Sequence, residues 1–125
     1  MLDARQRAQP VNKGRFQTES EALSWLVQRL VEELDPLEIW LFGSRARGDA
    51  RPDSDFDLLV VARPDGKFGS EDYDCVYAPT FGSDIACDVV PCSKQDFDDG
   101  AKLKTSFVRA ILEEGRCLFP ARGMH

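Results

Sequence analysis

The chain has 125 residues, of which 42% are hydrophobic, and this length and composition suit one globular domain. Its 22 acidic and 16 basic residues give a net charge of −6, which argues against non-specific binding to nucleic acid, because such binding depends on Lys and Arg. No run approaches the roughly 18 apolar residues of a membrane-spanning helix, and the polar N-terminus lacks the apolar stretch of a secretory signal, so we expect a cytoplasmic protein that does not contact a membrane.

The N-terminal third of the chain predicts an arm followed by a helix. Residues 1–16 show no apolar periodicity, and we expect them to form a flexible arm ahead of one domain over residues 17–120. A capping-box pattern begins at Thr18, with Glu21 three residues later. Leucine and valine then recur at the spacing of one helical face until a proline stops the pattern, so the sequence predicts a helix over about 19–34.

Three apolar runs predict strands. Residues 39–42 form a continuous apolar run that ends at a glycine, residues 56–61 have strong β propensity, and residues 84–90 form the third run. The polar segment 43–54 predicts a loop with room for one helical turn, and segment 63–69 predicts a turn.

The remaining elements are helices and one last strand. Aromatic and valine side chains at helical spacing indicate a helix over about 71–78, which Pro79 ends. Ser93 can cap a further helix, which Gly100 divides into two pieces, and residues 117–119 predict an edge strand. This order predicts a small α+β or α/β domain in which helices pack on one mixed β-sheet.

The cysteines do not indicate a metal site. They are scattered without a Cys-x-x-Cys pair, and the one histidine is the last residue. A structural zinc ion needs closely spaced Cys or His ligands, and cytosolic thiols stay reduced. We therefore expect four free cysteines, buried in the core: Cys75, Cys87, Cys92 and Cys117.

Two aspartates at the start of the second predicted strand are candidate metal ligands. Asp55 and Asp57 are two residues apart, so their side chains point to the same face, with Cα atoms roughly 6.5 to 7 Å apart. Such carboxylates repel each other unless a cation lies between them, and Mg²⁺ prefers oxygen ligands and keeps positions open for substrate phosphates. The alternative for this pair alone is a solvated acidic turn.

Asp88 adds a third carboxylate inside the third predicted strand. An aspartate in so apolar a strand is costly to bury without a partner, and its alternative role is a structural ion pair with an arginine. Three carboxylates on two neighbouring strands match what two-metal phosphoryl or nucleotidyl transfer requires.

The loop after the first predicted strand contains candidate phosphate-binding groups. Gly43 permits a tight turn and a close approach of the backbone to phosphate, and Ser44 offers a hydroxyl and an amide. Arg45 and Arg47 follow and can neutralise a polyphosphate. Gly43, Ser44 and Arg45 are therefore the candidate nucleotide-binding residues.

The segment GSRARGDARPDSDFDLLVV resembles the signature of the DNA polymerase beta-type nucleotidyltransferase superfamily, in which Gly-Ser, ten residues and Asp-x-Asp follow one another. The short chain is similar to the minimal nucleotidyltransferases, which are antitoxin partners of HEPN-domain toxins. The similarity extends from about residue 18 to residue 119.

The resemblance implies a nucleotidyltransferase fold and a role for each motif residue. Gly43 and Ser44 would hold the triphosphate of ATP, and Asp55 and Asp57 would coordinate two Mg²⁺ ions. Asp88 would bind the catalytic ion and help to deprotonate the acceptor hydroxyl. Arg45 as a phosphate contact has the alternative of a surface position.

The same resemblance implies transfer of AMP from ATP to a tyrosine of a cognate HEPN toxin, which makes the protein a type VII-like antitoxin. One alternative is a non-catalytic antitoxin that neutralises its partner by binding, and the acidic charge suits a basic partner protein. Another is a subunit similar to the catalytic half of antibiotic nucleotidyltransferases, which would need a homo- or hetero-oligomer to hold its small-molecule acceptor.

Overall fold

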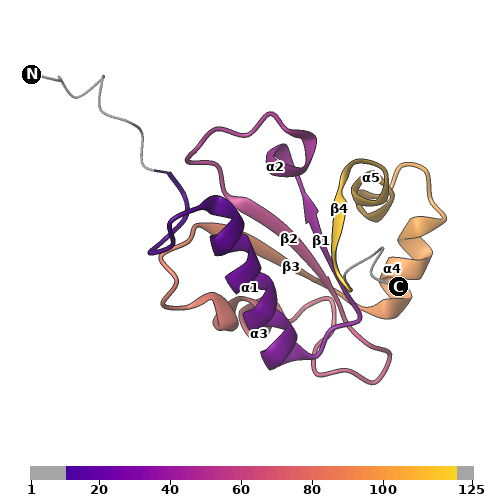
Figure 1. The fold of residues 1–125 in the computed structure, drawn as a ribbon. Coiled ribbons are helices and arrows are strands. Elements are labelled where there is room, and N and C mark those ends of the chain that lie inside the picture. Colours follow the sequence, from indigo (N-terminus) through magenta and orange to yellow (C-terminus); the bar gives the residue numbers. More distant parts are fainter. Residues whose placement is uncertain (1–10, 121–125) are drawn as a thin grey trace, which may run out of the picture.

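A mixed four-stranded sheet forms the centre of the molecule, with strand order β3-β2-β1-β4 (Figure 1). The computed structural model describes residues 11–120 of the chain. β1 (Glu38–Phe42) pairs antiparallel with both β2 (Phe56–Val61) and β4 (Arg116–Phe119), whereas β2 pairs parallel with β3 (Cys87–Cys92). The α+β class with a mixed sheet, predicted from the sequence, is confirmed.

Five α-helices and one 3₁₀ turn connect these strands within residues 11–120: α1 (Glu19–Leu34), α2 (Ser44–Arg47), α3 (Tyr73–Tyr77), η1 (Ala78–Thr80), α4 (Lys94–Ala101) and α5 (Phe107–Glu114). The predicted first helix is confirmed, and the hydroxyl of Thr18 accepts the Glu21 N–H at 3.0 Å as the capping pattern indicates. No helix of this part of the chain is both long and apolar enough to cross a membrane.

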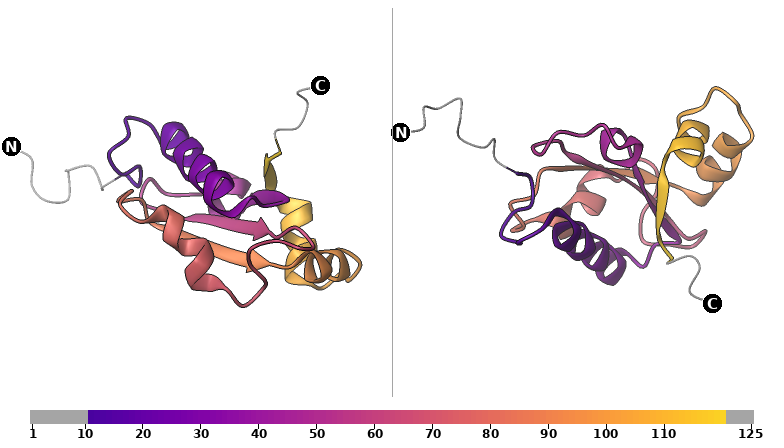
Figure 2. Two further views of the ribbon diagram at one scale, coloured as in Figure 1. Left: turned by 90° about the horizontal axis from the view of Figure 1, so that it is seen from below. Right: turned by 45° about the horizontal axis from the view of Figure 1, so that its top comes forward.

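Strand β2 lies between two hydrophobic clusters, because its side chains alternate between the two faces of the sheet. Leu58 and Val60 pack against α1 on one face, and Leu59 and Val61 pack against α4 and α5 on the other. All four side chains are at most 1% exposed. Figure 2 shows α1 and the α4–α5 pair separated by the strands. Since both faces are apolar, Asp57 distinguishes them: a one-residue slip would turn its carboxylate toward the cluster at α1, which disfavours that register.

Two elements differ from the sequence-based expectation. The third strand runs from Cys87 to Cys92 instead of 84–90, and Asp84, at the expected start, has a left-handed conformation with φ 58° that a strand does not contain. The strand continues through Pro91, which an edge strand tolerates because it needs no N–H on its free side. The helix expected over 71–78 covers only Tyr73–Tyr77. Pro79 lies at the start of the following 3₁₀ helix, where a backbone N–H has no partner inside the helix, so the missing N–H of proline is tolerated.

The segment before α1 packs against the domain. Residues 11–16 belong to the stretch that we expected to form a flexible arm, yet Asn12 is only 9% exposed and Arg15 donates to the carbonyl of Gly82 at 3.1 Å. Residues 1–10, the rest of that stretch, lie outside the described residues.

Candidate active site

The pairing of β2 with β3 brings two of the three predicted carboxylates together. Asp57 and Asp88 are register partners, so their side chains stand on the same face of strands that are about 4.8 Å apart. Asp55 lies two residues before Asp57 and is exposed, as is Asp88. Asp88 is the second residue of β3, not a buried residue in its middle, so the burial cost expected from the sequence does not arise. Within residues 11–120 no arginine forms an ion pair with it.

The half-buried Asp57 carries unfavourable charge. Burial raises the pKa of its carboxyl above the ordinary value of 3.8, and the neighbouring carboxylates of Asp88 and Asp55 raise it further. Arg47 acts in the opposite direction and lowers this pKa. An excess of negative charge at a concave, half-buried carboxylate is the electrostatic condition that a bound cation relieves.

Gly43 makes the turn that lets the loop after β1 approach Asp57. Its φ of 73° and ψ of −157° lie in a region that is essentially restricted to glycine. A Cβ at this position would collide with Oδ2 of Asp57 and lie 3.2 Å from its Cγ. The backbone therefore passes directly over the carboxylate, and the Gly-Ser and Asp-x-Asp halves of the motif meet at this contact.

Helix α2 begins immediately after this turn. Its first N–H groups have no acceptor inside the helix, and the Gly43 carbonyl accepts from Ala46 and Arg47, each at 3.1 Å. In the described part of the chain, the Ser44 hydroxyl has no hydrogen bond to another residue. Free N–H groups and a free hydroxyl at a helix start are suited to phosphate oxygens.

The two arginines of α2 have different environments. The side chain of Arg45 is only 7% exposed and donates to the backbone carbonyls of Ser54 and Pro52, at 2.8 to 3.1 Å. These bonds and the ion pair with Glu19 use most of its N–H donors, so its geometry does not favour the expected phosphate contact. Arg47 is 46% exposed, and its charge lowers the pKa of Asp57. Its ion pairs with Asp49 and Glu114 are long, at 3.4 and 3.9 Å. Arg47 is therefore the better candidate to contact a phosphate.

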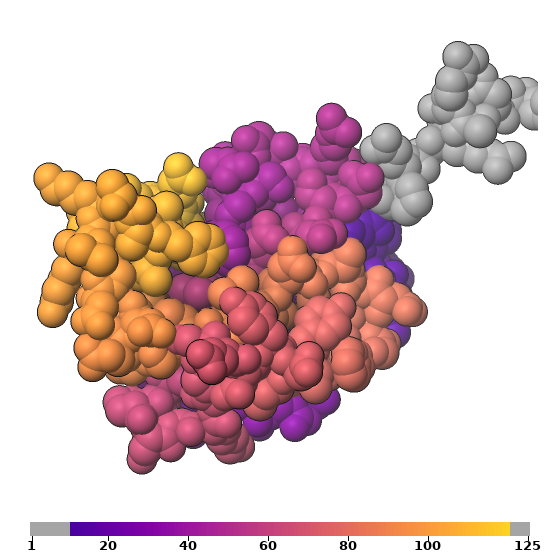
Figure 3. All heavy atoms as spheres, turned by 180° about the vertical axis from the view of Figure 1, so that it is seen from behind, coloured from indigo at the N-terminus to yellow at the C-terminus, as the bar shows by residue number. Residues whose placement is uncertain are grey.

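A pocket of about 460 Å³ opens over the paired carboxylates, between α3 and α5. Asp57 and Asp88 lie in its lining, together with four aromatic side chains: Phe42, Tyr73, Tyr77 and Phe107. Figure 3 shows this face of the molecule, with the surface hollowed between the α3 and α5 regions. Phe107 is 54% exposed and stands edge-on against Phe42, with 5.3 Å between ring centroids. The pocket thus combines acidic groups with exposed aromatic faces.

The chemistry of these donors fits a hard divalent cation. Carboxylate oxygens are the ligands that Mg²⁺ prefers, and Mg²⁺ is usually held by one or two carboxylates together with substrate phosphates. No group of three or more His, Cys, Asp or Glu side chains within residues 11–120 is arranged to hold a metal ion by itself. The carboxylates present and the lack of a complete set of ligands among these residues both fit a site in which substrate phosphate oxygens supply the remaining ligands.

Cys87, which is adjacent to Asp88 in the sequence, is not a competing ligand. Burial raises the pKa of its thiol to about 11, the carboxylates of Asp88 and Asp55 add to that rise, and the hydrogen bond with Thr80 lowers it in part. The group stays a thiol at neutral pH, and metals bind the thiolate. Cys87 and Cys92 are buried, as expected, whereas Cys75 is exposed and Cys117 is half-buried.

Comparison with known proteins agrees with this geometry. The sequence model of the nucleotidyltransferase domain family matches residues 23–118, a span that includes the Gly43 turn and all three carboxylates. The chain belongs to this family. The matched nucleotidyltransferase domain begins after the packed segment at residues 11–16.

One solved structure similar to this nucleotidyltransferase domain is that of a proposed nucleotidyltransferase from Sulfolobus solfataricus. The two chains are 28% identical, with a TM-score of 0.46, and the match covers 59% of this chain and 66% of that chain. A search of curated proteins found no match.

Proposed function

We propose that this nucleotidyltransferase domain transfers AMP from ATP to a hydroxyl acceptor in the presence of Mg²⁺. The observation that carries the proposal is the contact between the Gly43 turn and Asp57, next to Asp88 in register. It places a turn suited to phosphate directly against Asp57, which lines a pocket together with Asp88. The aromatic lining of that pocket offers faces on which a nucleobase can stack.

In the proposed reaction the residues of this chain bind and orient ATP and handle one proton. Ser44 and the first N–H groups of α2 donate to phosphate oxygens, and Arg47 offsets their negative charge. Asp55, Asp57 and Asp88 would hold Mg²⁺, as one ion or two, which supplies charge stabilisation at the phosphates. The acceptor oxygen attacks the α-phosphorus, the bond from that phosphorus to the oxygen bridging to the β-phosphate breaks, and pyrophosphate leaves. Asp88 accepts the hydroxyl proton.

We further propose that the acceptor is a tyrosine of a HEPN-domain toxin, so that the protein acts as an antitoxin in the cytoplasm. The resemblance of the motif segment supports this acceptor, and the net charge of −6 suits a basic partner. Apolar side chains are also exposed together around the pocket: Tyr73 at 55%, Tyr77 at 40% and Phe107 at 54%. A contiguous patch of exposed apolar side chains is typical of ligand- and protein-binding surfaces.

The acceptor is tested by co-expressing the chain with a HEPN-domain protein of the same organism and measuring the intact mass of that protein. The proposal predicts a mass increase of one or more AMP groups, which the Asp55→Asn, Asp57→Asn double variant does not produce. An unmodified HEPN protein that is still neutralised, by the wild type and the double variant alike, would instead favour inhibition by binding alone. A HEPN protein that is neither modified nor neutralised contradicts the antitoxin role and leaves a small-molecule acceptor to be tested.

A further inference from the structure

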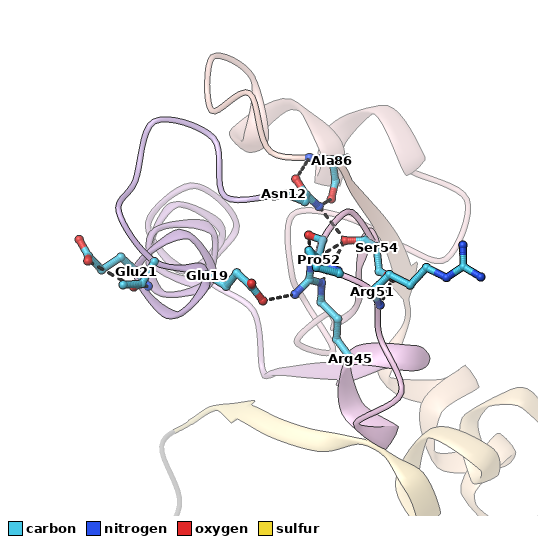
Figure 4. Close-up of polar contacts among 9 residues, drawn as sticks. Asn12, Glu19, Glu21, Arg45, Arg51, Pro52, Ser54 and Ala86 are labelled. Atoms are coloured by element: carbon cyan, nitrogen blue, oxygen red, sulfur yellow. Dashed lines mark hydrogen bonds and ion pairs between the residues drawn. The ribbon is translucent and has the colours of Figure 1, made fainter. Parts of the chain in front are cut away.

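The side chain of Asn12 is buried and makes three hydrogen bonds to backbone groups remote in sequence (Figure 4). Its Nδ2 donates to the carbonyls of Ser54, at 2.9 Å, and Ala86, at 2.7 Å. Its Oδ1 accepts the Ala86 N–H at 2.7 Å. Both hydrogens of the amide are used, so only a side chain with two donors and an acceptor can make all of these bonds.

These backbone groups lie directly before the carboxylates of the site. Ser54 precedes Asp55, and Ala86 precedes the first residue of β3, two positions before Asp88. The Phe56 N–H also donates to the Ala86 carbonyl, at 3.1 Å. Asn12 therefore joins the starts of β2 and β3 at the position from which their carboxylates emerge.

Arg45 donates to the same loop from the other side. Its guanidinium donates to the carbonyls of Pro52 and Ser54, and the Asn12 N–H donates to the Pro52 carbonyl at 2.8 Å. The guanidinium also lies 4.0 Å from the centroid of the Phe56 ring and bonds to Glu19. Since Arg45 follows Ser44 on α2, these bonds link all three backbone segments of the site: the Gly-Ser turn, the loop before Asp55 and the start of β3.

The segment that carries Asn12 is itself held in place. Gly14 has φ 57°, and a Cβ on it would collide with the carbonyl of Ser83 and lie 2.9 Å from Cγ1 of Ile85. Arg15 donates to the Gly82 carbonyl. Residues 11–16 therefore pack closely against residues 82–86, and Asn12 has a defined position from which to act.

We propose that Asn12 is a positioning residue for the carboxylate site, although it lies outside the motif segment and outside the span that matches the family. It holds together the backbones from which Asp55, Asp57 and Asp88 project, and so fixes where these carboxylates lie relative to one another. Small displacements of such groups are costly, since a shift of about 1 Å can reduce a rate about a hundredfold. The inference rests on the proposed function, but its test also uses metal binding, which is measured without turnover.

The test compares Asn12→Ala and Asn12→Ser with Thr18→Ala. Thr18→Ala removes the cap of α1 and lowers stability without touching the carbonyls of Pro52, Ser54 or Ala86. Mn²⁺ affinity is measured by electron paramagnetic resonance with a non-hydrolysable ATP analogue present, and kcat and KM are measured with ATP, all at a temperature at which each variant is folded.

We expect Asn12→Ala to weaken Mn²⁺ binding about tenfold and to lower kcat about a hundredfold, with a smaller change in KM. Asn12→Ser retains one donor, so its Mn²⁺ affinity and kcat should lie between those of Asn12→Ala and the wild type. If Asn12→Ala does not fold, the comparison of Asn12→Ser with the wild type decides the question. Thr18→Ala should leave Mn²⁺ affinity and kcat unchanged.

The proposal is overturned if the Asn12 variants and the wild type have equal Mn²⁺ affinity. It is also overturned if Thr18→Ala loses as much Mn²⁺ affinity as the Asn12 variants do, or if the wild-type protein binds no Mn²⁺. A wild-type protein that binds Mn²⁺ but transfers no nucleotide contradicts the proposed function instead. In that case the comparison of Mn²⁺ affinities still decides the role of Asn12.

Discussion

The carboxylate of Asp57 fills the space in which any side chain on Gly43 would begin. Phe42 is the register partner of Asp57 across β1 and β2, so the chain turns away from β1 immediately beyond this pair. The turn needs a positive φ and an absent Cβ at the same residue, and only glycine provides both. At this contact the Gly-Ser turn, proposed to bind the nucleotide, depends on Asp57, proposed to bind the metal.

Gly43→Ala should therefore damage both stability and function. The backbone conformation alone costs a residue with a Cβ about 1 to 3 kcal/mol, and the methyl group must also displace the Asp57 carboxylate. Chemical denaturation should show a loss of that size in the free energy of unfolding, and nucleotide transfer should fall below detection.

Gly48→Ala is the matched control, because Gly48 also has a positive φ, 86°, but has open space where a Cβ would lie. We expect it to lose about 1 kcal/mol of stability and to keep nucleotide transfer. If Gly43→Ala behaves like Gly48→Ala in both measurements, the contact with Asp57 is not needed for function.

Asp57→Asn should stabilise the metal-free protein at neutral pH. The pKa of Asp57 is raised in the folded state, so its ionised form costs stability above that folded pKa, and the cost disappears as the pH falls toward the ordinary value of 3.8. Thermal unfolding in a chelator from pH 4 to pH 8 should show an advantage of the variant that is largest at high pH.

Asp53→Asn is the control for that measurement, since Asp53 is an exposed loop residue and its replacement should change stability by less than about 0.5 kcal/mol. Mg²⁺ with an ATP analogue should then raise the Tm of the wild type more than that of Asp57→Asn. A variant that is less stable than the wild type at pH 7 would show that the negative charge of Asp57 is compensated within the protein.

Substitution of the two arginines of α2 should have different effects, on stability for Arg45 and on ATP binding for Arg47. Arg45→Ala removes bonds to the Ser54 and Pro52 carbonyls and should cost about 1 to 3 kcal/mol of stability. Arg47→Ala removes two long surface ion pairs and the favourable charge of Arg47 near Asp57, all at an exposed side chain, so its stability should change by less than about 1 kcal/mol. Its KM for ATP should nevertheless rise about tenfold, the equivalent of about 1.4 kcal/mol. A raised KM with unchanged stability in Arg45→Ala would restore the phosphate contact expected from the sequence.

The difference between Arg45 and Arg47 shows how far the sequence could predict this site. The helix over 19–34 and the strand that carries Asp57 were predictable, because capping and apolar periodicity are local signals. Asp88 could be named from its place in an apolar run, but its exposure depends on where β3 begins, and β3 begins at Cys87, three residues later than that run predicts.

Hydrogen bonds from a side chain to remote backbone groups could not be predicted, because they leave no pattern in the local sequence. Asn12 and Ala86 are 74 positions apart, and a carbonyl acceptor has no residue-specific pattern. The sequence therefore marked residues 11–16 as part of an arm, although they hold the strands of the site. The aromatic lining of the pocket could not be predicted for a similar reason, since Phe42 and Phe107 come into contact only when α5 packs beside β1.

Phe107→Ala should weaken ATP binding if the pocket holds the nucleobase. Stacking on an aromatic ring is worth about 1 to 3 kcal/mol per base, so the Kd for ATP should rise at least about fivefold in a calorimetric titration with Mg²⁺ present. Leu103→Ala is the control, because Leu103 is similarly exposed, at 60%, and does not line the pocket. Unchanged affinity in Phe107→Ala would mean that the base binds elsewhere.

The most direct test of the proposed AMP transfer is label transfer from ATP with Mg²⁺ and a HEPN-domain protein as acceptor. With the wild-type protein, label from the α-phosphate, and not from the γ-phosphate, should become attached to the acceptor. The Asp55→Asn, Asp57→Asn double variant should transfer none while circular dichroism shows it folded. Transfer of the γ-phosphate, or undiminished α-label transfer by the double variant, would contradict AMP transfer at these carboxylates.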